Sequence, residues 1–231
     1  MRTLFDIRAG AGLLLAGMLA MSGCSRGTEE APTQLELARA TQGVVSGLLQ
    51  RRKAAPPPAF SRAQLETVGL PITGFVAENR DLSAYFFRTE ARHDATPGLI
   101  EVWLSGDQKS SVTTRAGLVI ATRGLGDDLL SSTVPMAGSG PAPGPLAQQI
   151  RYGDNRERGL RLRCDLADLG PERIEILGRS QATRHLQQSC EGAGGRIVND
   201  FWADPRDGFL WQSRQWAGPG VGYLQLRRVI K

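Results

Sequence analysis

The chain has 231 residues, with 28 Lys and Arg against 23 Asp and Glu and a formal net charge of +5. This mild balance, without any run of basic residues interleaved with aromatic ones, argues against a nucleic-acid-binding protein. The length suits one sizeable domain with a hydrophobic core. The chain has three cysteines, so at least one of them cannot pair within the molecule.

Residues 1–23 predict a secretory signal peptide. The basic start MRTLFDIR precedes the apolar run AGAGLLLAGMLA, as in exported proteins, and the run is too short for a bilayer, which needs about 20 apolar residues. The following Met21-Ser22-Gly23-Cys24 resembles the lipobox of bacterial lipoproteins, with Met21 in place of the usual Leu. The alternative is an ordinary signal peptide with an incidental Cys nearby.

A lipidated Cys24 would anchor the mature protein by its N-terminus. Two membrane signals suffice for stable attachment, and a lipoprotein Cys typically carries several acyl chains. Ser25 stands where lipoproteins retained in the inner membrane usually have Asp, so the resemblance implies the periplasmic face of the outer membrane. Residues 24–32 are small and polar and predict a short tether.

The other two cysteines predict one disulfide, between Cys164 and Cys190, because an exported protein with two remaining cysteines most simply pairs them. Residues 159–166 alternate between apolar and charged, so Cys164 should face the core with Leu160, Leu162 and Leu166. Closing a loop of about 27 residues stabilises a fold by roughly 3 to 4 kcal/mol on the chain-entropy model.

Two helices are predicted near the start of the mature chain. Residues 33–52 place apolar side chains at helical spacing, with Thr33 as a possible N-cap and Pro56 to Pro58 beyond the end. Residues 62–68 predict a second, short helix, because Ser61 can cap it and Gly69 can stop it.

From Pro71 onward the pattern changes to the two-residue period of strands. Turn signals such as Pro97-Gly98 and Gly106-Asp107 separate the segments. The predicted strands cover residues 83–90, 99–105, 111–114, 118–123, 148–152, 159–166, 173–177, 182–189, 196–202, 209–216 and 222–230.

This pattern predicts a mainly β protein, an antiparallel meander that closes into a β-sandwich or a barrel-like sheet with an N-terminal helix. The stretch SGPAPGP at residues 139–145 divides the strands into two sets, but it is too short for a domain linker. Residues 33–231 are therefore predicted to form a single β-rich periplasmic domain.

The search for catalytic or cofactor motifs finds little. The sequence has no Walker or H-E-x-x-H pattern, and His185 with Cys190 makes a poor zinc site if Cys190 is in a disulfide. No metal or cofactor is expected. Gly218, Gly220 and Gly222 are interpreted as a bend into the last strand. Asp127 and Asp128 suit a helix start better than a glycosidase acid pair, because adjacent residues rarely flank a scissile bond.

Three of the four tryptophans, Trp202, Trp211 and Trp216, fall within the C-terminal segment. Aromatic rings beside Arg and Gln can form a sugar-stacking surface. The alternative, which composition favours, is a core hairpin whose aromatic rings pack inward and whose Arg214 pairs with a carboxylate.

This segment and TTRAGLVIATRGLGDDL at residues 113–129 resemble the YjbF family of group 4 capsule polysaccharide lipoproteins. A T-x-x-G-x-I-x-x-T-x-G-L element and a later S-R-Q-W-x-G-P-G element carry the resemblance. It implies a mostly β outer-membrane lipoprotein from capsule or exopolysaccharide production and export. The family offers no catalytic residues to carry over. The candidate surface for a partner or glycan is Arg214, Gln215, Trp216, Trp211, Arg115 and Arg123.

Two classes of function follow. As a non-enzymatic accessory factor, the protein would hold other export proteins, or the polysaccharide itself, at the outer membrane. As an enzyme of the same pathway, it would trim or modify the glycan. The missing catalytic motifs favour the first.

Overall fold

The computed structural model describes residues 60–231. The predicted signal peptide, Cys24, the tether and the helix at residues 33–52 lie outside them. The described elements are α2 (Arg62–Glu66), β1 (Ile72–Ala77), the 3₁₀ turn η1 (Glu78–Arg80), β2 (Leu82–Arg92), β3 (Ile100–Ser105), β4 (Ser111–Arg115), β5 (Leu118–Arg123), β6 (Asp128–Thr133), β7 (Met136–Ala137), β8 (Gly140–Pro141), β9 (Gly144–Arg151), β10 (Glu157–Ile176), β11 (Arg179–Gly192), β12 (Gly195–Ala203), β13 (Leu210–Trp216) and β14 (Tyr223–Ile230).

Helix α2 confirms the short helix predicted after Ser61. The Ser61 side chain accepts a hydrogen bond from the backbone N–H of Gln64, and the Gln64 side chain accepts one from the Ser61 backbone. This reciprocal capping box satisfies two backbone donors at the helix start. The helix ends at Glu66, before Gly69 turns the chain with a φ of +72°. Within residues 60–231, no helix is long and apolar enough to cross a membrane.

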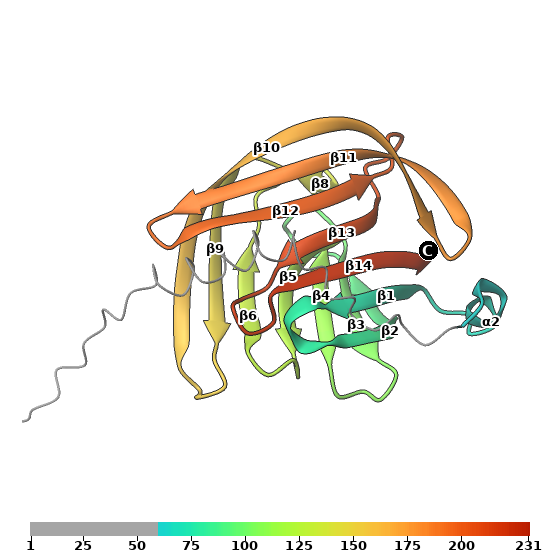
Figure 1. Ribbon diagram of the computed structural model, residues 1–231, viewed down its shortest axis with the longest axis horizontal. Coiled ribbons are helices and arrows are strands. Elements are labelled where there is room, and N and C mark those ends of the chain that lie inside the picture. Colours follow the sequence, from blue (N-terminus) through green and yellow to red (C-terminus); the bar gives the residue numbers. More distant parts are fainter. Residues whose placement is uncertain (1–59) are drawn as a thin grey trace, which may run out of the picture. The chain divides into compact units, whose positions relative to one another are not determined.

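Twelve of the strands form one antiparallel sheet, in the order β5-β4-β3-β2-β1-β14-β13-β12-β11-β10-β9-β6. The sheet curls until its edge strands β5 and β6 lie side by side, so that it is nearly closed and barrel-like (Figure 1). The prediction of a mainly β, antiparallel fold is therefore confirmed.

Side chains join the two edge strands. The backbone N–H of Leu129 donates to Thr122 Oγ1 at 2.9 Å, and Thr122 Oγ1 donates to Asp128 at 3.0 Å. Arg123 donates to the carbonyl oxygens of Thr122 and Leu129. We call these contacts the β5–β6 seam. They satisfy part of the edge, where unpaired backbone groups would otherwise attract other chains.

Three predicted elements need correction. Residues 127–128 were expected to start a helix, but Asp128 begins strand β6, because the turn before it is closed by its own side chain. The strands predicted at 159–166 and 173–177 are one strand, β10, whose ladder to β11 continues past an irregularity between Asp168 and Gly170. Strand β1 was missed, and it lies between β2 and β14.

The main core fills the inside of the curled sheet. Strand β9 alternates buried Leu146, Gln148 and Ile150 with exposed neighbours, as a strand with one solvated face should. The predicted inward face of β10 is confirmed for Leu160, Leu162 and Cys164, which are buried, whereas Leu166 is only half-buried. The largest fully buried side chains include Trp103, Phe75, Phe86 and Phe201.

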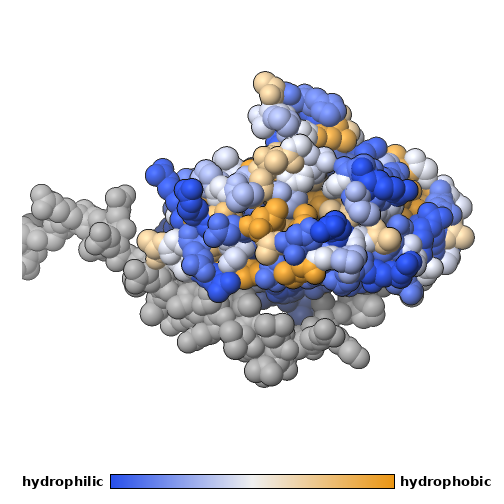
Figure 2. Space-filling view, turned by 90° about the horizontal axis from the view of Figure 1, so that it is seen from above, coloured by the Kyte–Doolittle hydropathy of each residue, from blue (hydrophilic) through white to orange (hydrophobic). Residues whose placement is uncertain are grey.

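The hairpin of β10 and β11 is much longer than its neighbours, and its far half arches back over the sheet toward α2 (Figure 1). A second, smaller core lies there, in which Ile174 and Ile176 pack with Leu65, Ile72 and Val229. Seen from above, hydrophobic residues gather toward the middle of this face, among hydrophilic residues (Figure 2).

A disulfide joins Cys164 and Cys190, which stand directly opposite each other on β10 and β11. Both residues are buried, at 1% and 0% exposure. The bond lies near the point where the hairpin leaves the sheet, because β9 pairs with β10 only from Glu157 to Cys164.

We therefore expect no free thiol in the mature chain that carries Cys24→Ala, measured by thiol titration under denaturing, non-reducing conditions. Replacing both Cys164 and Cys190 by Ala should lower the free energy of unfolding by roughly 2 to 5 kcal/mol. Detection of two free thiols in the Cys24→Ala chain would show that Cys164 and Cys190 are not joined.

Candidate functional site

The two stretches that carry the family resemblance meet inside the sheet, although β5 and β13 are not neighbours in it. Gln215 on β13 donates from Nε2 to the carbonyl oxygen of Gly117 at 2.9 Å, and its Oε1 accepts from the backbone N–H of Val119 at 2.9 Å. Gln215 is 5% exposed. One buried side chain thus ties the two stretches together across the interior.

A chain of amide groups continues from this contact. The backbone N–H of Trp216 donates to Asn199 Oδ1, and Asn199 Nδ2 donates to Gln188 Oε1. Gln188 in turn donates to the carbonyl oxygen of Ala142 at 3.1 Å. Each of these buried polar groups has a partner, as a stable interior requires.

The turn after β5 and the turn before β14 meet at one end of the sheet. Asp127 accepts a hydrogen bond from the backbone N–H of Gly153 at 2.6 Å and lies 3.5 Å from the guanidinium of Arg80. A Cβ atom at Gly220 would overlap the Asp127 carboxylate, so this close approach requires glycine. The interpretation of Gly218 and Gly222 as a bend is confirmed by their positive φ angles, +117° and +73°.

Arg115 and Arg123 lie on β4 and β5 and are held by their own neighbours. Arg115 donates to both carboxylate oxygens of Asp94, at 2.8 and 2.7 Å, and this hydrogen-bonded pair holds the pKa of Asp94 well below its usual range. Arg123 belongs to the β5–β6 seam. Arg115 therefore holds the loop between β2 and β3, and Arg123 holds the edge of β5.

Arg214 lies on the outer face of β13, opposite Gln225 of β14. Its Nε and Nη2 atoms donate to the two carboxylate oxygens of Glu78, each at 2.7 Å, and its guanidinium stacks 3.5 Å from the ring centroid of Tyr223. Burial opposes the charge of Arg214, but the bonds and charge of Glu78 outweigh it, so the pKa of Arg214 is raised. Arg214 is thus paired with a carboxylate, as the core-hairpin interpretation predicted.

A second polar group lies beside it on the outer face. His185 has its Nδ1 3.0 Å from Glu172 and its Nε2 3.0 Å from Asp200, and its ring stacks on Trp202 with centroids 4.6 Å apart. A neutral imidazole carries one N–H, so it can donate to only one of these carboxylates at a time. The contacts tie the arched half of the hairpin to β12.

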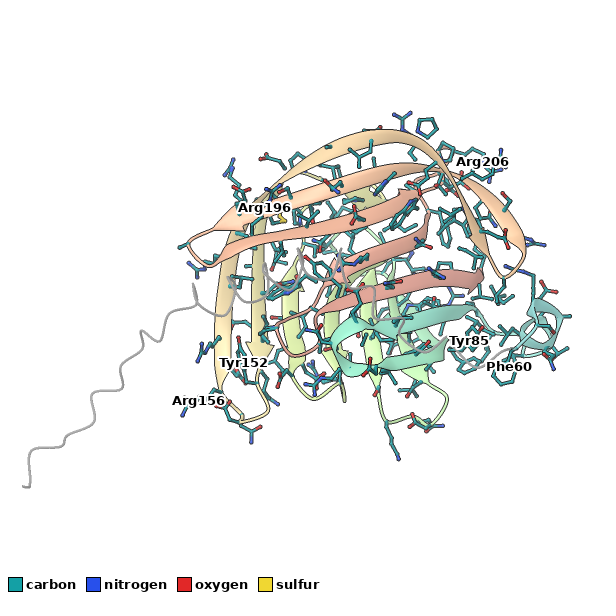
Figure 3. The ribbon with its side chains drawn as sticks, in the orientation of Figure 1. Phe60, Tyr85, Tyr152, Arg156, Arg196 and Arg206 are labelled. Atoms are coloured by element: carbon teal, nitrogen blue, oxygen red, sulfur yellow. A yellow bond between two sulfur atoms is a disulfide. The ribbon has the colours of Figure 1, made fainter. Side chains whose placement is uncertain are left out.

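Trp211 belongs to a different cluster, at the turn between β12 and β13. Its indole N–H donates to Asp204 at 3.1 Å, and its ring meets Phe209 edge to face. The ammonium of Lys231 lies 4.0 Å from the Phe209 centroid. Arg206 donates to Asp204 through two nitrogens, and this pairing keeps the pKa of Asp204 well below its usual range. Figure 3 shows Arg206 at the surface of this turn.

The candidate surface is therefore dispersed. Gln215 and Trp216 are buried, at 5% and 4% exposure, so they do not contribute to an exposed surface. Arg214, Trp211, Arg115 and Arg123 lie in four separate settings. Among residues 60–231, no group of three His, Cys, Asp or Glu side chains could hold a metal ion.

A match to a family model decides the identity of the chain. Residues 56–229 match the model described as group 4 capsule polysaccharide lipoprotein GfcB, YjbF. The chain belongs to the YjbF family. The crystal structure of the hypothetical lipoprotein YmcC from Escherichia coli K12 has the same fold: the TM-score is 0.63 at 17% identity, over 84% of this chain and 94% of that one. A search of curated proteins found no match.

The sequence did not predict the buried ion pair of Arg228 and Glu101. Arg228 is 5% exposed and donates to Glu101 at 2.6 Å, with Trp103 stacked 4.1 Å from its guanidinium; burial lowers the pKa of Arg228. Its position on the apolar face of β14, after Leu224 and Leu226, was the available signal. The sequence also did not show which carboxylates pair with His185 and Arg214, because Glu172, Asp200 and Glu78 lie on other strands or turns.

The contact between the two YjbF-family stretches yields a stability prediction. Gln215→Ala leaves the Val119 N–H and the Gly117 carbonyl without their partner, and an unsatisfied buried group costs about 1 to 3 kcal/mol. We expect the free energy of unfolding to fall by about 2 to 4 kcal/mol in a denaturant titration. Gln212→Ala, on the outer face of the same strand, is the control and should cost about 0.5 kcal/mol or less. Equal losses in the two variants would contradict a specific role for Gln215.

Proposed function

We propose that this YjbF-family lipoprotein is anchored to the periplasmic face of the outer membrane, where it serves as a non-enzymatic accessory factor in capsule or exopolysaccharide production or export. Family membership supports the pathway. The signal peptide, Cys24 and Ser25 support the location. Its partners would be other export proteins of the pathway or the polysaccharide itself.

The accessory role is supported by the contacts of the two stretches that carry the family resemblance, because these contacts hold the sheet together. Gln215 joins β13 to β5 within the interior, and Asp127 joins the turns at one end of the sheet. These side chains hold the sheet in shape and do not converge on an accessible cleft. A scaffold that presents surfaces to partners needs such a framework, whereas an enzyme needs its characteristic side chains at the substrate.

The test of the function is a deletion strain complemented with wild-type or variant genes, with surface and released polysaccharide measured separately. Loss of surface polysaccharide without a change in chain length or in reducing ends supports the accessory role. New reducing ends produced by the purified protein from isolated polysaccharide would instead favour a glycan-modifying enzyme.

Anchoring gives its own prediction. Labelled fatty acid should enter the wild-type protein and not a Cys24→Ala variant, because Cys24 is the acylated residue. Membrane fractionation of the same cells should place the wild type in the outer membrane. Equal labelling of both proteins would exclude lipidation at Cys24.

A role of Arg214 in contacting a partner or glycan can be tested separately from its contribution to stability. Trp216→Ala should cost about 3 to 5 kcal/mol as a buried Trp truncation, and Arg214→Ala should cost about 1 to 3 kcal/mol through its lost charged hydrogen bonds. Glu78→Gln breaks the same ion pair but keeps the guanidinium. We expect Arg214→Ala and Glu78→Gln to melt alike, while only Arg214→Ala reduces surface polysaccharide. Equal amounts of surface polysaccharide with these two variants would mean that Arg214 contributes only to stability.

A further inference from the structure

Exposed apolar side chains gather at one end of the described domain. Among residues 60–231, the exposed large hydrophobic side chains are Phe60, Val68, Leu70, Leu169 and Leu177, at 47%, 44%, 44%, 54% and 38% exposure. All but Leu169 lie around α2 and the tip of the β10–β11 hairpin. We call Phe60, Val68, Leu70 and Leu177 the apolar tip.

The two parts of the apolar tip are fixed to each other. Arg62 of α2 donates to the carbonyl oxygens of Ile176 and Leu177 at the end of the hairpin, and to that of Val229 on β14. Phe60 packs on Tyr85, with ring centroids 5.9 Å apart. Figure 3 shows Phe60 and Tyr85 together at this end of the domain, and Tyr152 and Arg156 at the opposite end. The exposed side chains therefore belong to a preformed surface.

Leu177 occupies an unusual backbone conformation. Ile176 pairs with Arg179, so Leu177 and Gly178 form a two-residue hairpin turn, and both have positive φ angles, +46° and +73°. Asn, Asp or Gly is normally preferred at the first of these positions. A leucine held there, with its side chain exposed, carries a backbone cost that the fold itself does not require. Such an outlier is a reason to look for function.

The place where the chain enters the domain indicates what the tip contacts. Phe60 in the apolar tip is the first described residue, and Cys24 precedes it by 36 positions in the sequence. In the lipoprotein proposed above, on which this inference rests, Cys24 holds the N-terminal side of the chain at the membrane. The charges on α2 and on residues 172–179 of the hairpin are balanced, which suits a largely zwitterionic lipid surface; they are Arg62, Arg173 and Arg179 against Glu66, Glu172 and Glu175.

We infer that the apolar tip is a membrane-contact surface, on which the domain rests against the leaflet that holds its anchor. The anchor keeps the domain at a high effective concentration near the lipid, so weak insertion of a few side chains suffices. Full burial of a Leu or Val side chain is worth roughly 1.5 to 3 kcal/mol, so the exposed part of each tip side chain should strengthen contact by a factor of roughly three to ten. Contact would fix which surfaces of the domain face the periplasm.

Hydrogen exchange tests the contact. The acylated mature protein in vesicles of phosphatidylethanolamine with a minority of phosphatidylglycerol is compared with the Cys24→Ala chain in buffer. We expect amides of residues 60–70 and 174–179 to exchange several-fold more slowly in vesicles, and those of the β9–β10 turn at residues 152–156 to be unchanged. This protection should persist at raised salt, because insertion is apolar.

Variants of the apolar tip test whether it contacts the membrane or something else. The double variant Val68→Ser, Leu70→Ser should lose the protection, whereas Leu169→Ser, which removes a more exposed leucine on β10, should keep it. The proposed membrane contact is wrong if vesicles do not slow amide exchange at the tip, or if the double variant stays protected. Protection that grows with protein concentration in the absence of lipid would instead indicate a second copy on the tip. No polysaccharide is involved, so failure here leaves the proposed function standing.

Discussion

The position of strand β5 is the constraint on which the rest of the sheet depends. A curled sheet of this size leaves two edges, and their backbone groups need partners. On one side, Thr122, Arg123 and Asp128 bind β5 to β6 through the seam. From within, Gln215 holds the start of β5 by the Gly117 carbonyl and the Val119 N–H. Strand β5 is therefore fixed both by its neighbour and across the interior.

This way of closing the sheet makes the interior specific. Apolar alternation already opposes a one-residue shift of register, and buried amide and ionic groups add the requirement that each meets its own partner. Arg228 shows how much free energy such a group can involve, because it is buried against Glu101 and Trp103. Removal of one member of such a buried pair typically costs about 3 to 5 kcal/mol, although the pair itself adds little net stability. The polar interior thus favours one register more than it raises overall stability.

Most strands could be predicted from the sequence, but the side-chain contacts that join them could not. Period-two alternation and glycine turns located most strands, and the inward face that includes Leu160, Leu162 and Cys164 followed directly. Strand β6 was misread because Asp127 and Asp128 look like a helix cap, whereas their carboxylates bond the backbone of neighbouring turns. Likewise, no spacing reveals that Arg214 meets Glu78, a residue 136 positions away. Contacts of this range come from topology, which local patterns do not encode.

The arch of the β10–β11 hairpin connects the rigid sheet to α2. Its near half belongs to the sheet and carries the disulfide, while its far half has left β9 and lies on the outer face. There it is held by a small core around Ile174 and Ile176 and by the hydrogen bonds of Arg62. Because Arg62 also donates to a carbonyl oxygen of β14, one guanidinium joins helix α2, the hairpin tip and the sheet. The hydrogen bonds of Arg62 therefore add a second link between α2 and the sheet, beside the backbone that joins α2 to β1.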